Sequence, residues 1–157
     1  MVSPTETDTI RSKYLHQIWD HDPGAATAIL VSPDGGTTVR SVDMKEFSDF
    51  AVMVFTTVLI GAGPTKVEIV AADDAALATN LVVIKDSGVI AADALGDWVI
   101  ETCTVAEIAQ EGADNDSNPR YVGGRITCDN AGDEAVVTYF AIPRRPQLDL
   151  TPQTTIS

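Results

Sequence analysis

The chain has 157 residues, which is enough for one domain or for one domain with terminal arms. Its 10 basic and 23 acidic residues give a net charge of −13, which argues against a surface for nucleic acid or for an anionic membrane. The opening residues are polar and acidic, and no apolar run is as long as a membrane span, so neither a signal peptide nor a transmembrane segment is expected.

Residues 1–25 are expected to form an N-terminal arm. Within this arm, the apolar residues of segment 9–19 recur at helical spacing and favour a short surface helix. The sequence Asp22-Pro23-Gly24 then breaks the chain. Segments 26–31 and 37–42 are predicted to be strands, because a cluster of proline, aspartate and glycine residues separates them.

Segment 50–60 is the most apolar stretch of the chain, and its β-branched residues favour a strand over a helix. Alternation gives this strand two apolar faces, with Phe50, Val52, Val54, Val58 and Ile60 on one and Ala51, Met53, Phe55 and Leu59 on the other. A strand that is apolar on both faces either lies between two layers or contacts a partner subunit.

Three elements are predicted between this strand and residue 97. Segment 66–71 alternates cleanly, which predicts a strand whose polar side chains, including Glu68, face solvent. Asp73 or Asp74 is expected to cap a short helix. Segment 81–84 is short and apolar, which indicates another strand.

Segment 97–103 also alternates, which predicts a half-buried strand with Trp98 and Ile100 on its apolar side. A helix of one or two turns is predicted to follow, because the Thr-x-x-Glu pattern of a capping box begins at Thr104. Gly112 is expected to end this helix in a left-handed conformation.

Segments 121–128 and 135–142 are predicted to be strands joined by a hairpin turn at residues 129–132. The second strand has apolar residues on both faces, as segment 50–60 does. Gly123 and Gly124 inside the first strand indicate a bulge or a close approach of two backbone segments.

Eight short strands with regular turns predict a mainly β fold, an antiparallel β-sandwich of jelly-roll type, with one or two short helices in its connections. This domain is expected to span residues 26–142. Residues 143–157 contain three prolines and no period, so they are expected to form an extended C-terminal tail. At roughly 3.3 Å per residue, this tail could reach up to about 50 Å.

No cofactor or metal site is expected. His16 and His21 lie near two aspartates, but structural metal sites need three or four ligands and no further histidine or cysteine completes this set. Residues 114–118 offer oxygens at alternate positions, as a calcium loop does, yet Pro119 stands where such a loop needs glycine.

Enzymatic activity is not expected either. No motif combines a nucleophile with a base and an orienting group. Cys103 and Cys128 are too few for a disulfide scaffold, and they are expected to be buried thiols made in a reducing compartment.

Two segments resemble small virion structural proteins of tailed bacteriophages: KVEIVAADDAALATNLVVIKDSGVIAADALGDWVIETCTVAEIAQEG and RYVGGRITCDNAGDEAVVTYFAIPR. The resemblance covers about residues 40–145 and lies in structural phrases such as GDEAVVTY, not in catalytic motifs. It implies a non-enzymatic, self-associating component of the virion, assembled in the host cytoplasm. The implied positions are a capsid decoration or stabilising subunit, or a collar, head-tail connector or tail component.

The expected partners are other copies of the chain, a trimer by analogy with that family, and the phage major coat protein. Six residues are candidates for these contacts, being apolar side chains of the two-faced strand and basic or apolar side chains of the tail: Met53, Phe55, Arg144, Arg145, Leu148 and Leu150. The alternative is a soluble jelly-roll module that binds carbohydrate, which would need exposed aromatic side chains on one sheet face.

Overall fold

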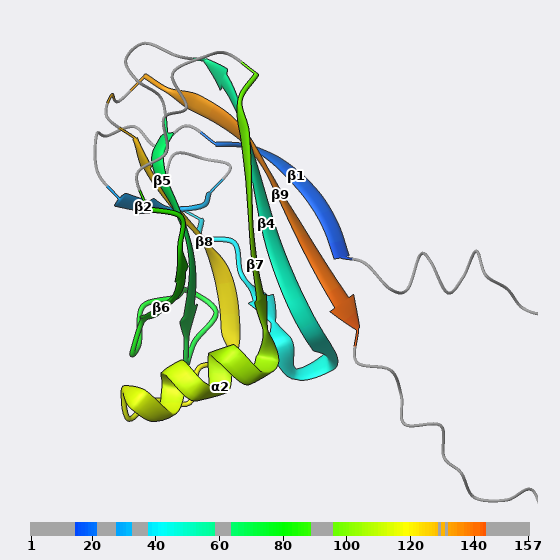
Figure 1. The fold of residues 1–157 in the computed structure, drawn as a ribbon, viewed down its shortest axis with the longest axis vertical. Coiled ribbons are helices and arrows are strands. Elements are labelled where there is room, and N and C mark those ends of the chain that lie inside the picture. Colours follow the sequence, from blue (N-terminus) through cyan, green and yellow to red (C-terminus); the bar gives the residue numbers. More distant parts are fainter. Residues whose placement is uncertain are drawn as a thin grey trace, which may run out of the picture.

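The computed structural model describes residues 15–21, 28–32, 38–58, 64–88, 96–128, 130 and 132–143. These residues form a mainly β structure with two antiparallel sheets, called A and B below, and an α-helix at one end of them (Figure 1). The predicted mainly β, antiparallel class is confirmed.

The chain crosses between the two sheets several times. Sheet A has the order β1 (Leu15–His21), β9 (Glu134–Pro143), β4 (Phe47–Val58) and β7 (Trp98–Thr104). Sheet B has the order β2 (Ala28–Leu30), β8 (Tyr121–Cys128), β5 (Pro64–Ala72) and β6 (Val82–Asp86), and the two-residue β3 (Val42–Asp43) also pairs with β8. The helices are α2 (Val105–Asp114) and the 3-10 turn η1 (Met44–Glu46).

The core lies where side chains of the two sheets meet. One cluster of buried residues takes Phe50, Val52 and Val54 from sheet A and Val67 and Ile69 from sheet B. The side chains on this inner face of β4 agree with the face predicted from alternation, and burying them removes apolar surface from water.

Tyr139 of β9 ties the two sheets together inside this core. Its hydroxyl accepts a hydrogen bond of 2.6 Å from the Gly124 N–H and donates one of 3.2 Å to the Arg40 carbonyl. A Cβ on Gly124 would lie 3.0 Å from a methyl group of Val31, tighter than nearly all real contacts. The predicted close approach of two backbone segments is found at Gly123, where a Cβ would lie 2.7 Å from the Arg40 carbonyl oxygen. At Gly124 the near neighbours are side chains, and the missing Cβ leaves room for the tyrosine hydroxyl.

Segment 9–19 does not form the predicted helix over its described part. Residues 15–21 form β1, an edge strand of sheet A that pairs along its whole length with β9. Part of the segment expected to be an N-terminal arm thus belongs to the sheet. The apolar spacing in this segment suits a helix, but pairing with β9 satisfies the backbone groups of a strand instead.

The hairpin predicted around residues 129–132 is also wrong. β8 lies in sheet B and β9 lies in sheet A, so the two strands do not pair with each other. The turn residues indicate only that the chain reverses direction. Which strand β8 or β9 pairs with depends on how its side chains pack against the rest of the protein.

Two predicted helix features differ in the structure. Residues 73–80 form turns instead of a helix, because the Asp74 carboxylate accepts hydrogen bonds from the N–H groups of Ala76, Ala78 and Thr79. α2 passes through Gly112 and ends at Asp114. A Cβ at Gly112 would lie 2.5 Å from the Pro119 ring, so the glycine permits a loop to pack closely, and it does not end the helix.

The strand predicted at residues 37–42 is also absent over most of its described part. Residues 38–41 have no strand structure, and within this segment only Val42, the first residue of β3, pairs with β8. The predicted strands 26–31, 50–60, 66–71, 81–84, 97–103, 121–128 and 135–142 all have counterparts in the structure.

Candidate functional site

The outer face of sheet A, which points away from sheet B, carries exposed apolar side chains. The exposed fractions are 63% for Trp98, 45% for Ile100 and 40% each for Phe55 and Ile142. Soluble proteins rarely gather large apolar side chains in one exposed area without a binding partner. This face is therefore the candidate functional site.

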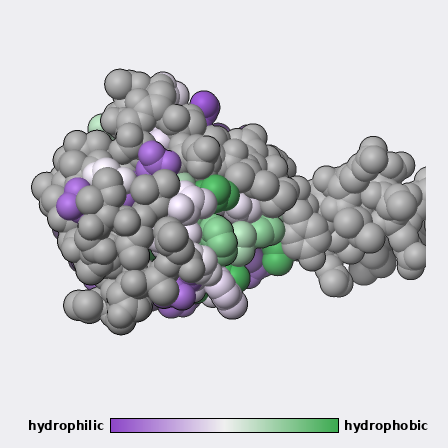
Figure 2. Space-filling model, turned by 90° about the horizontal axis from the view of Figure 1, so that it is seen from above, coloured by the Kyte–Doolittle hydropathy of each residue, from purple (hydrophilic) through white to green (hydrophobic). Residues whose placement is uncertain are grey.

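Strand register places these side chains next to one another. Phe55 of β4 lies opposite Trp98 of β7, and Met53 lies opposite Ile100. On the other side of β4, Phe55 pairs with the half-buried Val136 of β9. In Figure 2, hydrophobic surface (green) gathers on the side of the molecule where Figure 1 places sheet A. The result is a continuous apolar area across three strands.

The structure places two of the six predicted contact residues on this face. Met53 is half-buried there and Phe55 is exposed. The other four, Arg144, Arg145, Leu148 and Leu150, lie outside the described residues. The two-faced pattern of segment 50–60 thus reflects one core face and one outer face.

The predicted burial of Trp98 and Ile100 is wrong. β7 turns Val99 and Cys103 inward, where they pair with Val54 and Phe50 of β4. Both faces of this strand carry apolar side chains, Trp98 and Ile100 on one and Val99 and Cys103 on the other. The alternating pattern therefore could not show which face lies against the core. A further signal was the threonine at position 102, on the same face as Ile100, which suits an outer sheet surface.

A cavity of about 450 Å³ lies at one end of this face. Phe50, Ala51, Phe140 and Ile142 contribute to its lining, as do Thr102 and Thr104 of the edge strand β7. Its polar lining includes Asp49 and the pair formed by Lys85 and Glu107. Its volume lies within the range of about 300–1,000 Å³ that is typical of binding pockets.

The predicted capping box of α2 is confirmed beside this cavity. The Thr104 hydroxyl accepts a hydrogen bond of 3.2 Å from the Glu107 N–H, and the Glu107 carboxylate accepts one of 2.8 Å from the Thr104 N–H. The hydrogen bond from Lys85, together with those from Thr104, lowers the pKa of Glu107 to about 2. Glu107 is therefore charged at neutral pH, and its carboxylate completes the N-terminal cap of α2.

Replacing Thr104 by alanine should lower the free energy of unfolding by about 1 kcal/mol, the usual cost of a lost N-cap. Serine at the same position keeps a hydroxyl and should recover most of this loss. Urea denaturation of Thr104→Ala and Thr104→Ser measures both effects. Equal stability of both variants and the parent protein would show that the cap does not contribute.

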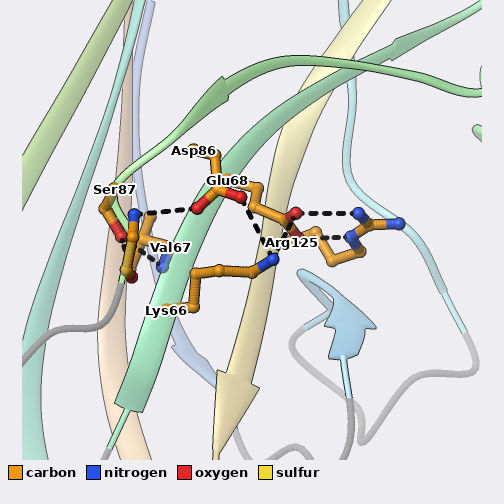
Figure 3. Close-up of polar contacts among 7 residues, drawn as sticks. Lys66, Val67, Glu68, Asp86, Ser87 and Arg125 are labelled. Carbon is orange, nitrogen blue, oxygen red and sulfur yellow. Dashed lines mark hydrogen bonds and ion pairs between the residues drawn. The ribbon is translucent and has the colours of Figure 1, made fainter.

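Sheet B carries a buried carboxylate, Glu68, which the alternating pattern had predicted to face solvent. Only 2% of its side chain is exposed, and it accepts hydrogen bonds of 2.6 and 2.9 Å from the Arg125 guanidinium. Lys66 lies 2.9 Å from the same carboxylate and also contacts Asp86 (Figure 3). Burial alone would raise the pKa of Glu68, but the hydrogen bonds from Arg125 and Lys66 outweigh it and lower the pKa.

The ion pairs around Glu68 are arranged as a structural feature of sheet B and not as a reactive site. The Glu68 carboxylate is closed off by two cations from neighbouring strand positions, and Asp86 is further engaged by the Gly88 N–H. Three contacts from these cations occupy most of the roughly four lone-pair positions of the carboxylate, and its side chain is buried. The prediction that Glu68 faces solvent is wrong, because cross-strand Arg125 covers it.

The cysteines carry no sign of nucleophilic chemistry. Cys103 and Cys128 are both buried thiols, as expected. Burial raises the pKa of Cys103 to about 12, so this thiol keeps its proton near neutral pH. In the part of the chain that the structure describes, no group of three or more His, Cys, Asp and Glu side chains could hold a metal ion.

Comparison of the chain with protein-family models, with curated proteins and with solved structures finds no match. Among the described segments, no helix has the length and apolar character needed to cross a membrane. The resemblance to tailed-phage virion proteins therefore stays a prediction.

Proposed function

We propose that the protein is a non-enzymatic structural subunit of a tailed-phage virion, a decoration or stabilising protein that binds the head shell through the outer face of sheet A. The observation that supports this most is the exposed apolar area around Phe55, Trp98 and Ile100. Burial of such a surface against another protein is the main favourable term in most protein associations.

The proposed subunit is a jelly-roll-like β-sandwich. The support for this arrangement is the larger core cluster, which draws buried residues from both sheets. The chain also passes several times between sheets A and B, as strand order in jelly rolls requires. An outer apolar face on one sheet then belongs to an interface and not to the core.

An acidic decoration subunit is consistent with an outer position on a head that contains DNA. With a net charge of −13, the protein would be repelled by packaged nucleic acid, so its contacts with the particle would be made to protein. A trimer remains the proposed copy number, because decoration at three-fold positions of a shell favours three-fold symmetry. Collar, connector and tail positions are the alternatives for the same surface.

One observation favours a second candidate, a carbohydrate-binding module. Trp98 and Phe55 are exposed and lie opposite each other, so two aromatic side chains share one sheet face. Their neighbours Met53 and Ile100 are apolar, however, and binding sites for polar ligands also need well-placed polar groups. The virion proposal fits this surface better.

The proposal predicts that Ile100→Asp weakens binding to phage heads at least about 10-fold, because a charge in an apolar contact costs about 1.4 kcal/mol or more. The matched control is Val83→Asp, which changes an apolar side chain of similar exposure, 37%, on sheet B. Co-sedimentation with heads assembled from the phage major coat protein measures both variants.

Equal binding by the Ile100→Asp variant and the parent protein would overturn the proposed contact. Binding of the parent protein to immobilised glycans, with loss in a Trp98→Ala variant and no binding to heads, would favour the carbohydrate-binding candidate instead.

A further inference from the structure

The cavity at the end of sheet A lies where the C-terminal segment leaves the sheet. β9 ends at Pro143, one residue after the cavity-lining Ile142. In the register of β1 and β9, Leu15 lies opposite Ala141, so both terminal segments leave from this same end. The cavity is therefore close to the point from which residues 144–157 begin.

The sequence of that segment suits an apolar cavity. Leu148 and Leu150 are two residues apart, so in extended backbone they point to the same side and could enter one cavity together. Asp149 between them would point away. The apolar lining from Ala51, Phe140 and Ile142 matches two leucine side chains.

Geometry favours the cavity of a second copy over the chain's own. Pro143 and Pro146 bias Ile142 and Arg145, the residues before them, towards extended backbone. Leu148 stands six residues after Ile142, and at roughly 3.3 Å per residue an extended segment carries it about 20 Å beyond the cavity of its own chain.

Charge supports the same contact. The Asp49 carboxylate at the cavity is hydrogen-bonded by the Ser48 hydroxyl, and no cation among the described residues forms an ion pair with it. Arg144 and Arg145 are adjacent positive charges on a strongly negative chain. An arginine of an incoming segment can form a charge-assisted hydrogen bond with such a carboxylate.

We propose that the C-terminal segment of one copy docks in this cavity of a second copy, with Leu148 and Leu150 inside it, and so links the subunits of the assembly. The inference rests on the proposed self-association, but it assigns that contact to the cavity at one end of the outer face, whose lining does not include Phe55, Trp98 or Ile100. Repeating the exchange around a closed ring gives a cyclic oligomer.

Single-cysteine variants of the full chain test this contact. Ala51→Cys places a thiol in the cavity, and Leu148→Cys or Leu150→Cys places one on the segment. The two proteins are mixed under mild oxidation, with a size tag on one of them. Because each protein carries one new cysteine, a tagged–untagged heterodimer joined through these two positions forms only between copies. Mass spectrometry of the linked peptides identifies the joined cysteines and separates them from Cys103 and Cys128.

The matched control replaces Ala51→Cys by Ala109→Cys, an exposed alanine of α2 that is not part of the cavity lining. The Ala51→Cys mixture should give at least roughly tenfold more heterodimer than the control, because docking raises the local thiol concentration. Circular dichroism and light scattering on the same samples establish that each variant is folded and assembled.

Equal yields in the two mixtures would overturn the inference. So would a link that forms only within one chain when Ala51→Cys and Leu148→Cys are combined in the same protein, because the segment would then occupy its own cavity.

If the protein remains assembled without the link, only this inference fails. If Ile100→Asp keeps full head binding while the link forms, only the proposed shell contact fails.

Discussion

Replacing Val54 by aspartate should unfold the protein, whereas replacing its neighbour Met53 should not. Val54 is 3% exposed in the main core, where it lies between Val99 of β7 and Val137 of β9. An unpaired charge at such a site costs several kcal/mol, which is a large share of the roughly 5–15 kcal/mol that stabilises a typical domain. Circular dichroism and urea denaturation measure the loss.

Met53→Asp is the matched control, because it places the same charge one residue away on the outer face of the same strand. This variant should keep the fold and lose binding to other subunits or to the shell. A Val54→Asp protein that stays folded with unchanged stability would show that β4 does not have the inner face described above. A Met53→Asp protein that assembles and binds normally would remove the outer face of β4 from the interface.

Removing Arg125 should produce the second large effect. Arg125→Met leaves the buried Glu68 carboxylate with Lys66 as its remaining cation, and breaking a buried pair by removing one partner typically costs about 3–5 kcal/mol. The contact with Lys66 favours the lower end of this range. Urea denaturation at neutral pH measures the free energy of unfolding of the variant and of the parent protein.

The deficit of Arg125→Met should shrink as pH falls. In the parent protein, the pKa of Glu68 is lowered below its ordinary value of 4.5, so its contribution is complete above that pH and is lost as pH falls through the lowered pKa. In the variant, Arg125 no longer balances the cost of burying the charged Glu68 carboxylate, so the pKa of Glu68 should rise. Protonation at mildly acidic pH then removes the buried charge and its cost. Denaturation curves at pH 7 and pH 4 compare the two.

Two controls separate the buried pair from surface electrostatics. Arg120→Met breaks an ion pair with Asp43 in which both side chains are more than one third exposed, so it should cost less than about 1 kcal/mol. The double variant Glu68→Met with Arg125→Met removes both charges and should be more stable than Arg125→Met alone. An equal loss for Arg125→Met and Arg120→Met would contradict a buried role for Glu68.

Local features of the sequence were predicted well, because they depend on residues close together in the chain. The capping box of Thr104 and Glu107 is complete within four consecutive residues. The strand nature of segment 50–60 depends on its β-branched residues, and its inner face of Phe50, Val52 and Val54 follows from the two-residue period of a strand. The antiparallel, mainly β class follows from several such strands with short connections.

Where a local sequence pattern was compatible with two structures, contacts with residues far away in the chain determined which one formed. Residues 15–21 could suit either a helix or a strand, and pairing with β9 made them a strand. β8 and β9 flank a turn that suits a hairpin, yet they joined different sheets because each pairs with strands far away in the chain. Turn and periodicity patterns contain no information about such partners.

The candidate site shows the same division. The sequence by itself determined that β4 carries two apolar faces, and so that one of them lies against the core or a partner. Only the tertiary structure decided that Trp98 and Ile100 share the outer face with Phe55. The register between β4 and β7 sets which of the alternating β7 side chains point towards the core. It also decided that Glu68 is buried, since Arg125 from a neighbouring strand covers it. Alternation fixes which side chains share a face, whereas burial depends on what packs against that face.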